Sequence, residues 1–250
     1  MTMRFPFFAL LCACLLASAP HAAAQTADLS DFQGDTANTA AQIKKLMRDF
    51  HLSSFGMNIS RALDGGDAAG AEKLLSSRAE QNPETKDNVA YQMYESRIAF
   101  LRGDYAAAYR LADAAIARVS RCFLPGKPRK LGDAKTDAYV SSLFIYRYQA
   151  AAWLKNYPQA LADLDSAMAI RPSTELMRAR TFTLINLKEY EKASSAADEL
   201  YAADPGALAK SKLAPVYCAR LQQNGFTPRA CAQLAQSQPV GVSTAAAAAL

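Results

Sequence analysis

The chain is poor in the residues from which catalytic and metal sites are usually built. Of its 250 residues two are histidines, and only His51 lies beyond the first 24 positions. The sequence contains no H-E-x-x-H zinc motif, no G-x-S-x-G serine motif, no glycine-rich phosphate loop and no C-x-x-C pair. Asp163 and Asp165 do not form a metal pair, because residues two apart on a helix point to different sides. We therefore expect no enzymatic activity, no bound metal and no cofactor.

The chain also lacks strong charge of one sign and long apolar segments. Its 28 Lys and Arg residues face 23 Asp and Glu residues, and a formal net charge of +5 is too small to indicate a nucleic-acid partner. Beyond residue 24, no stretch reaches the roughly 18 apolar residues that a transmembrane helix needs. We expect neither nucleic-acid binding nor stable insertion into a membrane.

Residues 1–24 have the composition of a secretory signal peptide. Arg4 supplies a positive N-terminal charge, the apolar stretch "FPFFALLCACLLA" follows, and small residues precede Gln25. These features predict cleavage after Ala24 and export, and we expect a periplasmic protein of a Gram-negative bacterium. The letters "LCAC" leave an alternative open, since they resemble a lipoprotein signal in which Cys14 is lipidated.

Four segments of the remaining chain share one pattern. Residues 154–172 read "LKNYPQALADLDSAMAIRP", and residues 187–205, which begin 33 positions later, read "LKEYEKASSAADELYAADP". Residues 65–83 and 102–120 fit the same frame. Self-similarity at such a spacing is typical of repeat proteins in which each unit packs on the next.

Each repeat is predicted to be a pair of helices joined by a tight turn. Apolar residues recur at nearly 3.6-residue intervals on both sides of the turn, where glycine can end the first helix because it accepts a left-handed backbone. A small residue one turn into each second helix allows the paired helices to approach closely. These residues are Ala71, Ala108, Ala160 and Ala193. A proline, which cannot continue a helix, closes three of the four second helices.

This pattern resembles the tetratricopeptide repeat family, whose turn signature is present here as Gly103-Asp104-Tyr105. The resemblance covers residues 52–205 and extends weakly to residue 238. It implies an all-α fold, in which an α-solenoid of stacked antiparallel helix pairs winds into a right-handed superhelix with a concave groove. Four repeats and a truncated fifth are expected.

The sequence departs from the family at two kinds of position. Lys155 and Lys188 stand in the turns where the family has glycine. Four first-helix positions that are usually apolar carry polar residues, namely Asn58, Glu95, Arg147 and Arg180. We expect the register of the first helices to differ from the family by about one residue.

The pattern divides the chain into regions. A mobile N-terminus and an amphipathic capping helix, over 36–50, are expected within residues 25–51, with the helix packed on the first repeat or continuous with it. Residues 52–238 are the solenoid, and residues 239–250 are a disordered tail. An inserted loop with two prolines and two glycines interrupts the solenoid at residues 121–135.

First helices line the concave side in the family that the chain resembles, and this predicts a peptide-binding groove. Its candidate residues are Met57, Ser60, Tyr94, Arg97, Tyr146, Gln149, Trp153, Arg178 and Phe182. Aromatic side chains interleaved with arginine suit an extended or helical peptide, because both give much contact or bidentate bonding per residue. The alternative is that Tyr146, Trp153 and Phe182 belong to the core between repeats.

The inserted loop is basic. Its charged residues are Arg121, Lys127, Arg129, Lys130 and Lys135. Segments rich in proline and lysine are usually exposed, so we expect a solvated insertion that contributes little stability. The alternative is a loop that packs on the repeats.

Three cysteines remain once the signal peptide is removed, and two of them are expected to form a disulfide. Cys218 and Cys231 lie at equal distances on either side of the predicted turn at Asn224-Gly225, where paired helices face one another. Flanking alanines allow the close approach that the bond requires. Cys122 is left as a free thiol or as the site of an intermolecular bond.

Taken together, these features predict a non-enzymatic periplasmic adaptor or assembly protein that binds a protein or peptide partner in its groove. A second interpretation is a structural subunit that is permanently buried in an envelope or secretion complex. A weaker third is an accessory protein of an enzyme. Fold-level analogy supplies a binding mode and no partner.

Overall fold

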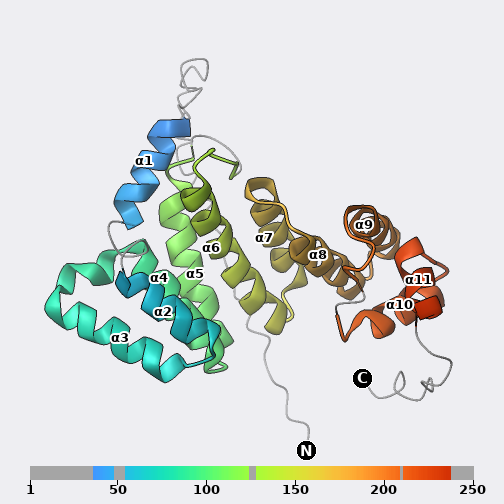
Figure 1. Cartoon of the computed structure of the whole chain (residues 1–250), viewed down its shortest axis with the longest axis horizontal. Coiled ribbons are helices and arrows are strands. Elements are labelled where there is room, and N and C mark those ends of the chain that lie inside the picture. The colour runs from blue at the N-terminus through green and yellow to red at the C-terminus, as the bar shows by residue number, and fades with distance from the viewer. Residues whose placement is uncertain (1–35, 48–53, 124–127, 209–210, 238–250) are drawn as a thin grey trace, which may run out of the picture. The chain divides into compact units, whose positions relative to one another are not determined.

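A computed structural model of the chain describes residues 36–47, 54–123, 128–208 and 211–237 (Figure 1). Within these ranges the chain forms eleven α-helices and one 3-10 helix, with no strand, and the predicted all-α class is confirmed. The helices are α1 (Thr36–Met47), α2 (Ser54–Asp64), α3 (Ala68–Gln81), η2 (Pro83–Asp87), α4 (Val89–Leu101), α5 (Tyr105–Ser120), α6 (Ala134–Trp153), α7 (Tyr157–Ile170), α8 (Thr174–Asn186), α9 (Tyr190–Ala203), α10 (Ala214–Gln223) and α11 (Arg229–Ser237). The predicted signal peptide, the predicted tail and Lys127 lie outside the described residues.

Helices that follow one another along the chain pack against one another. The most extensive contacts join α6 to α7 and α4 to α5, which are pairs linked by short turns, and further contacts join α5 to α6, α8 to α9 and α7 to α8 (Figure 1). At the C-terminal end α10 contacts α8, and α11 contacts α9. This arrangement is compatible with an α-solenoid.

The turns within the pairs have one backbone conformation. The second residue after each first helix has a positive φ, and the five residues are Gly66 (77°), Gly103 (79°), Lys155 (58°), Lys188 (62°) and Gly225 (84°). Three of them are glycines, which adopt this conformation without steric cost. Lys155 and Lys188 adopt the same conformation in spite of their Cβ atoms, so the turns with lysine have the same backbone shape as the turns with glycine.

Side-chain caps start the second helix of three pairs. The carboxylates of Asp67 and Asp104 accept hydrogen bonds from the backbone N–H three residues ahead, at 2.8 and 2.9 Å. Asn156 caps α7 with a longer contact of 3.4 Å to the N–H of Gln159. Such caps satisfy backbone donors that the first helical turn leaves free.

Buried apolar side chains form two cores. The first runs from α1 through α7 and includes Leu176 at the start of α8. The second begins at Leu184 and Ile185 near the end of α8 and continues through α11. The four small residues predicted to allow close helix packing, at positions 71, 108, 160 and 193, are all fully buried. The two cores thus divide α8 between them.

A charged cluster lies among the helices of the first core. Arg147 of α6 donates from Nη2 to Oδ1 of Asp163 at 2.6 Å and from Nε to Oδ2 at 3.0 Å, and it also forms an ion pair with Asp113 of α5. The Asp163 side chain is 1% exposed and that of Arg147 is 13% exposed. Asp165 instead accepts from Arg180 of α8 at 2.8 Å. The two neighbouring carboxylates therefore face different helices.

The inserted loop is anchored in the core, which corrects the expectation of a solvated segment. Cys122, Phe123 and Leu131 are buried members of the first core. The carboxylate of Asp137 accepts from the backbone N–H of Leu131 at 2.7 Å and from that of Gly132 at 3.1 Å. The loop is buried in part because its sequence contains apolar side chains among the basic ones. The basic residues of the loop that the structure describes are exposed.

Helix α1 buries one face. Ala40, Ile43 and Met47 are buried in the first core, and the main contacts of the helix are with α4 and α6. We expected it either on the first helix pair, α2 and α3, or continuous with α2; residues 48–53, which would join it to α2, lie outside the described residues. It is held beside α6 by an ion pair of 3.1 Å between Lys44 Nζ and Asp133 Oδ1.

A disulfide closes the C-terminal hairpin. It joins Cys218 of α10 to Cys231 of α11, with Cα atoms 5.4 Å apart. Cys122 is a free cysteine. Small neighbours such as the buried Ala230 permit the short distance between the helices.

Candidate functional site

The residues predicted to line the groove fall into separate places in the structure. Ser60, Tyr94, Arg97 and Tyr146 form contacts among α2, α4 and α6. Gln149, Arg178 and Phe182 meet around a pocket between α6 and α8. Met57 is exposed on α2, and Trp153 lies at the end of α6.

The contacts among α2, α4 and α6 bury Tyr94, whereas Arg97 meets a largely exposed Asp64. Tyr94 is only 2% exposed, its hydroxyl lies 3.4 Å from Ser60 Oγ and from the carbonyl of Gly56, and burial raises its pKa to about 12. Arg97 donates to Asp64 at 2.7 Å and to the hydroxyl of Tyr146 at 3.2 Å. Its guanidinium also lies 5.4 Å from the centre of the Tyr146 ring. Tyr94 therefore cannot contact a partner, which corrects its assignment to the groove.

The pocket between α6 and α8 has a volume of about 330 Å³. Its lining residues are Ile145, Tyr148 and Gln149 of α6, Ser173 before α8, and Glu175, Leu176, Arg178, Ala179 and Phe182 of α8. On each helix these positions recur at intervals of three or four residues, so they share one face. The sequence placed Gln149, Arg178 and Phe182 in the groove, and the structure brings these three together here.

One wall of the pocket is aromatic. Phe182 stacks on Tyr217 of α10, with ring centroids 4.1 Å apart. Burial raises the pKa of Tyr148, and the nearby Tyr217 phenol adds to this effect. Tyr148 therefore remains a neutral phenol that can donate or accept a hydrogen bond. A row of aromatic side chains thus extends over α6, α8 and α10.

Charges of both signs border the pocket. Arg178 is half-buried, and its Nη1 donates to the carbonyl of Ala207 at 3.2 Å, which fixes the side chain. Glu175 is exposed in the first turn of α8, where hydrogen bonds from its own backbone N–H and from Ser173 lower its pKa. The pocket can therefore offer one cation, one anion and a phenol around an apolar floor.

The sequence missed most of this pocket. Six of its nine lining residues were not among the predicted ones, namely Ile145, Tyr148, Ser173, Glu175, Leu176 and Ala179. Tyr217, which stacks on Phe182, was not predicted either. Tyr148 directly follows Arg147, whose polar side chain at a usually apolar position signalled a shifted register. A helix rotated by one residue would have placed Ile145 and Tyr148 beside Gln149.

Trp153 is found on a different surface. It is the last residue of α6, it is 62% exposed, and it stacks on Tyr105 of α5 with ring centroids 4.8 Å apart. Leu101 and Leu154, which are also exposed, end α4 and follow α6. Tyr105, Trp153 and Leu154 form an apolar patch at the C-terminal end of α6, and we call it the turn-end patch.

Neither a metal site nor a membrane span is found in the part of the chain that the structure describes. No cluster of three or more His, Cys, Asp or Glu side chains is placed to hold a metal ion there. None of its helices combines the length and the apolar character needed to cross a membrane. Comparisons with protein-family models, with curated proteins and with solved structures each found no match.

Proposed function

We propose that the chain is an exported, non-enzymatic adaptor or assembly protein whose helix pairs form a tetratricopeptide-repeat-like superhelix of four repeats and a truncated fifth. The repeat pattern of the sequence supports this proposal, as does the packing of consecutive helices from α2 to α9. The N-terminal signal supports a periplasmic location. The partner is a protein or peptide.

The pocket between α6 and α8 carries the proposal. Phe182, Leu176 and Ile145 supply apolar surface, while Tyr148, Gln149 and Arg178 supply hydrogen-bonding groups. Ligand pockets typically combine an apolar lining with a few convergent polar groups in this way. A volume of about 330 Å³ lies at the lower end of such pockets. We therefore expect a peptide anchored by a single bulky apolar side chain, with its backbone bonded by the polar groups.

A blocking substitution tests the pocket without removing any contact from the core. Ala179 lines the pocket and is half-buried, so Ala179→Arg should fill the space. Ala162→Arg, at an exposed position of α7, is the matched control. Both variants and the unaltered protein, each starting at Gln25, would be crosslinked in an envelope fraction, and the captured proteins compared.

The expected result is that one set of proteins is captured by the unaltered protein and by Ala162→Arg but lost with Ala179→Arg. All three proteins should melt at similar temperatures. Equal capture by the two variants would mean that partners do not use this pocket.

The turn-end patch supports a second candidate function, that of a structural subunit. Trp153 and Leu154 expose large apolar surfaces side by side, and surfaces of this kind are often covered by another protein. A subunit of an envelope or secretion complex would elute only with a large assembly when native extract is fractionated by size. An adaptor would elute largely as a free protein.

A further inference from the structure

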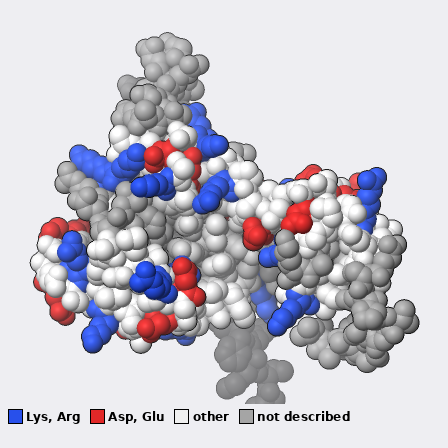
Figure 2. Space-filling model, in the orientation of Figure 1, with Lys and Arg blue, Asp and Glu red and all other residues white. Residues whose placement is uncertain are grey.

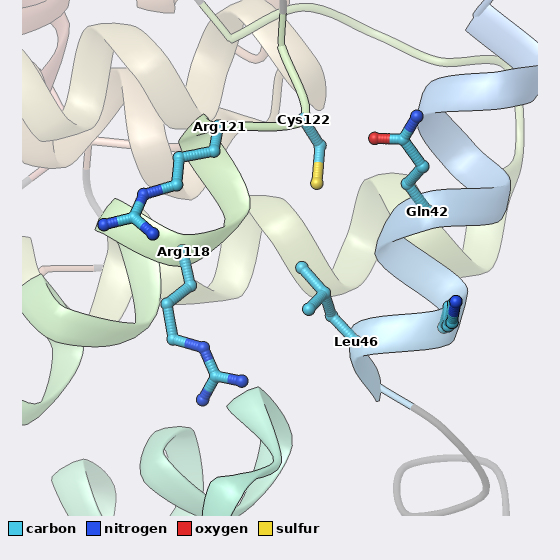
Figure 3. Close-up of a pocket in the computed structure, with 6 residues that line it drawn as sticks. Gln42, Leu46, Arg118, Arg121 and Cys122 are labelled. Atoms are coloured by element: carbon cyan, nitrogen blue, oxygen red, sulfur yellow. The ribbon is translucent and has the colours of Figure 1, made fainter.

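A second pocket lies between α1 and the C-terminal end of α5, far along the sequence from the residues of the peptide pocket. It has a volume of about 520 Å³, within the range of small-molecule sites. Its lining residues are Gln42, Lys45 and Leu46 of α1, Arg118 of α5, and Arg121 and Cys122 directly after α5 (Figure 3). Two segments separated by about seventy residues in sequence therefore line one open pocket.

The charge around this pocket is positive. Lys45, Arg118 and Arg121 all line it, and none of them forms an ion pair with a carboxylate among the residues that the structure describes. The neighbouring Lys44, by contrast, is paired with Asp133. Figure 2 shows Lys and Arg side chains gathered around α1, with a small acidic group among them. Concave sites lined by charge of one sign concentrate ions of the opposite sign.

The same pocket has an apolar wall. The side chains of Leu46 and Cys122 point into the space from opposite sides (Figure 3). Cys122 is 8% exposed, and burial raises the pKa of its thiol, so that it is neutral and behaves as a small apolar group. Arg118, which is half-buried, extends from α5 along another side of the pocket (Figure 3).

We propose that this pocket binds a small amphiphilic anion, with a phosphate or carboxylate head and a short apolar tail. The head lies against Lys45, Arg118 and Arg121, because guanidinium groups bind such oxyanions in bidentate geometry. The tail lies against Leu46 and Cys122. Isolated surface cations bind anions weakly. Three cations beside apolar side chains should bind a ligand that has both an anionic head and an apolar tail more tightly than a ligand that has only one of them.

Three probes separate the two halves of this recognition. Octyl phosphate carries both head and tail, inorganic phosphate carries only the head, and octyl glucoside carries the same tail on an uncharged head. Each would be titrated by calorimetry into the protein starting at Gln25, below the concentration at which the detergents form micelles. We expect octyl phosphate to bind about tenfold or more tightly than either of the others, and to weaken as salt is raised.

Substitution of two exposed cations shows where the probe binds. Lys45→Gln combined with Arg121→Gln should weaken the binding of octyl phosphate by about tenfold or more, since two charge-assisted contacts are lost. Arg110→Gln, an exposed position about two turns earlier on α5, is the control and should leave the affinity unchanged.

Cys122 gives an independent readout at the site. N-ethylmaleimide alkylation, located at Cys122 by peptide mapping, should slow when octyl phosphate saturates the protein, and the double variant should lose this protection at the same probe concentration. The proposal fails if octyl glucoside or inorganic phosphate binds as tightly as octyl phosphate. It also fails if the double variant binds normally, or if saturating octyl phosphate leaves Cys122 alkylation unchanged.

Discussion

Replacing Arg147 by methionine should destabilise the protein strongly. The substitution would leave the Asp163 carboxylate, which is 1% exposed, with Gln159 as its remaining partner, at 3.0 Å. Breaking a buried ion pair by removing one member costs about 3–5 kcal/mol, because the other charge stays buried. Arg147 itself is 13% exposed, and its second partner Asp113 lies largely in solvent, so we expect the lower end, about 3 kcal/mol.

The double variant Arg147→Met with Asp163→Leu separates two free energies: the cost of leaving one charge unpaired, and the net contribution of the ion pair to stability. Apolar residues of similar size often replace a buried ion pair without loss of stability. We therefore expect the double variant to unfold within about 1 kcal/mol of the unaltered protein. Asp163→Leu alone should fall between, because Arg147 keeps Asp113 as a partner.

Urea unfolding followed by the circular dichroism of the helices would measure these differences. A loss of about 3 kcal/mol corresponds to a fall of roughly 6–12 °C in the melting temperature of a domain of this size. A loss below about 1 kcal/mol in Arg147→Met would refute the reasoning, since it would mean that the Asp163 carboxylate is solvated or neutral. No recovery of stability in the double variant would also refute it, since the cost would then not come from the unpaired charge.

The pH dependence gives a further check on the same variant. Burial raises the pKa of Asp163, and Arg147 opposes the shift, so removing the arginine should raise this pKa further. A carboxyl group with a raised pKa binds more protons in the folded than in the unfolded state, and its destabilising effect is relieved as pH falls. The deficit of Arg147→Met should therefore shrink on acidification from neutral pH.

Three other substitutions or treatments follow from the fold. Leu131→Ala should cost about 2–4 kcal/mol in thermal or urea unfolding because the loop is anchored in the core, whereas Lys130→Ala should stay within about 0.5 kcal/mol. Lys155→Gly and Lys188→Gly should each stabilise the protein by up to about 1 kcal/mol, because glycine relieves the cost of the positive φ; a loss of stability in both would contradict this. Reducing the disulfide should weaken protection from hydrogen exchange in α10 and α11 by about 3 kcal/mol and leave α4 to α7 unchanged.

The helix pairs could be predicted from the sequence because their signals are local. Turn residues, capping Asp and Asn side chains, and the small residues of the second helices act within a few positions of one another. The pairing of Cys218 with Cys231 also rested on local geometry around Asn224-Gly225, and the structure contains the same bond.

What the sequence could not supply depends on contacts between distant segments. A polar residue such as Arg147 can be buried because Asp163 meets it from the next helix, and local periodicity does not identify that partner. Leu131 stands in a basic, proline-containing loop, yet a core formed by other helices receives it. The pocket of Lys45 and Arg121 likewise requires α1 to lie beside the end of α5, which no local pattern states.

Packing between neighbours has a mechanical consequence. Because most interfaces of the described helices join elements adjacent in the chain, they lie in series between its two ends. Tension applied to those ends loads each interface with the same force, so the weakest pair should yield first while the rest keep their structure. Such a protein extends in steps instead of breaking at once. The disulfide limits the extension of the C-terminal pair, since α10 and α11 cannot be drawn apart beyond the bond that joins them.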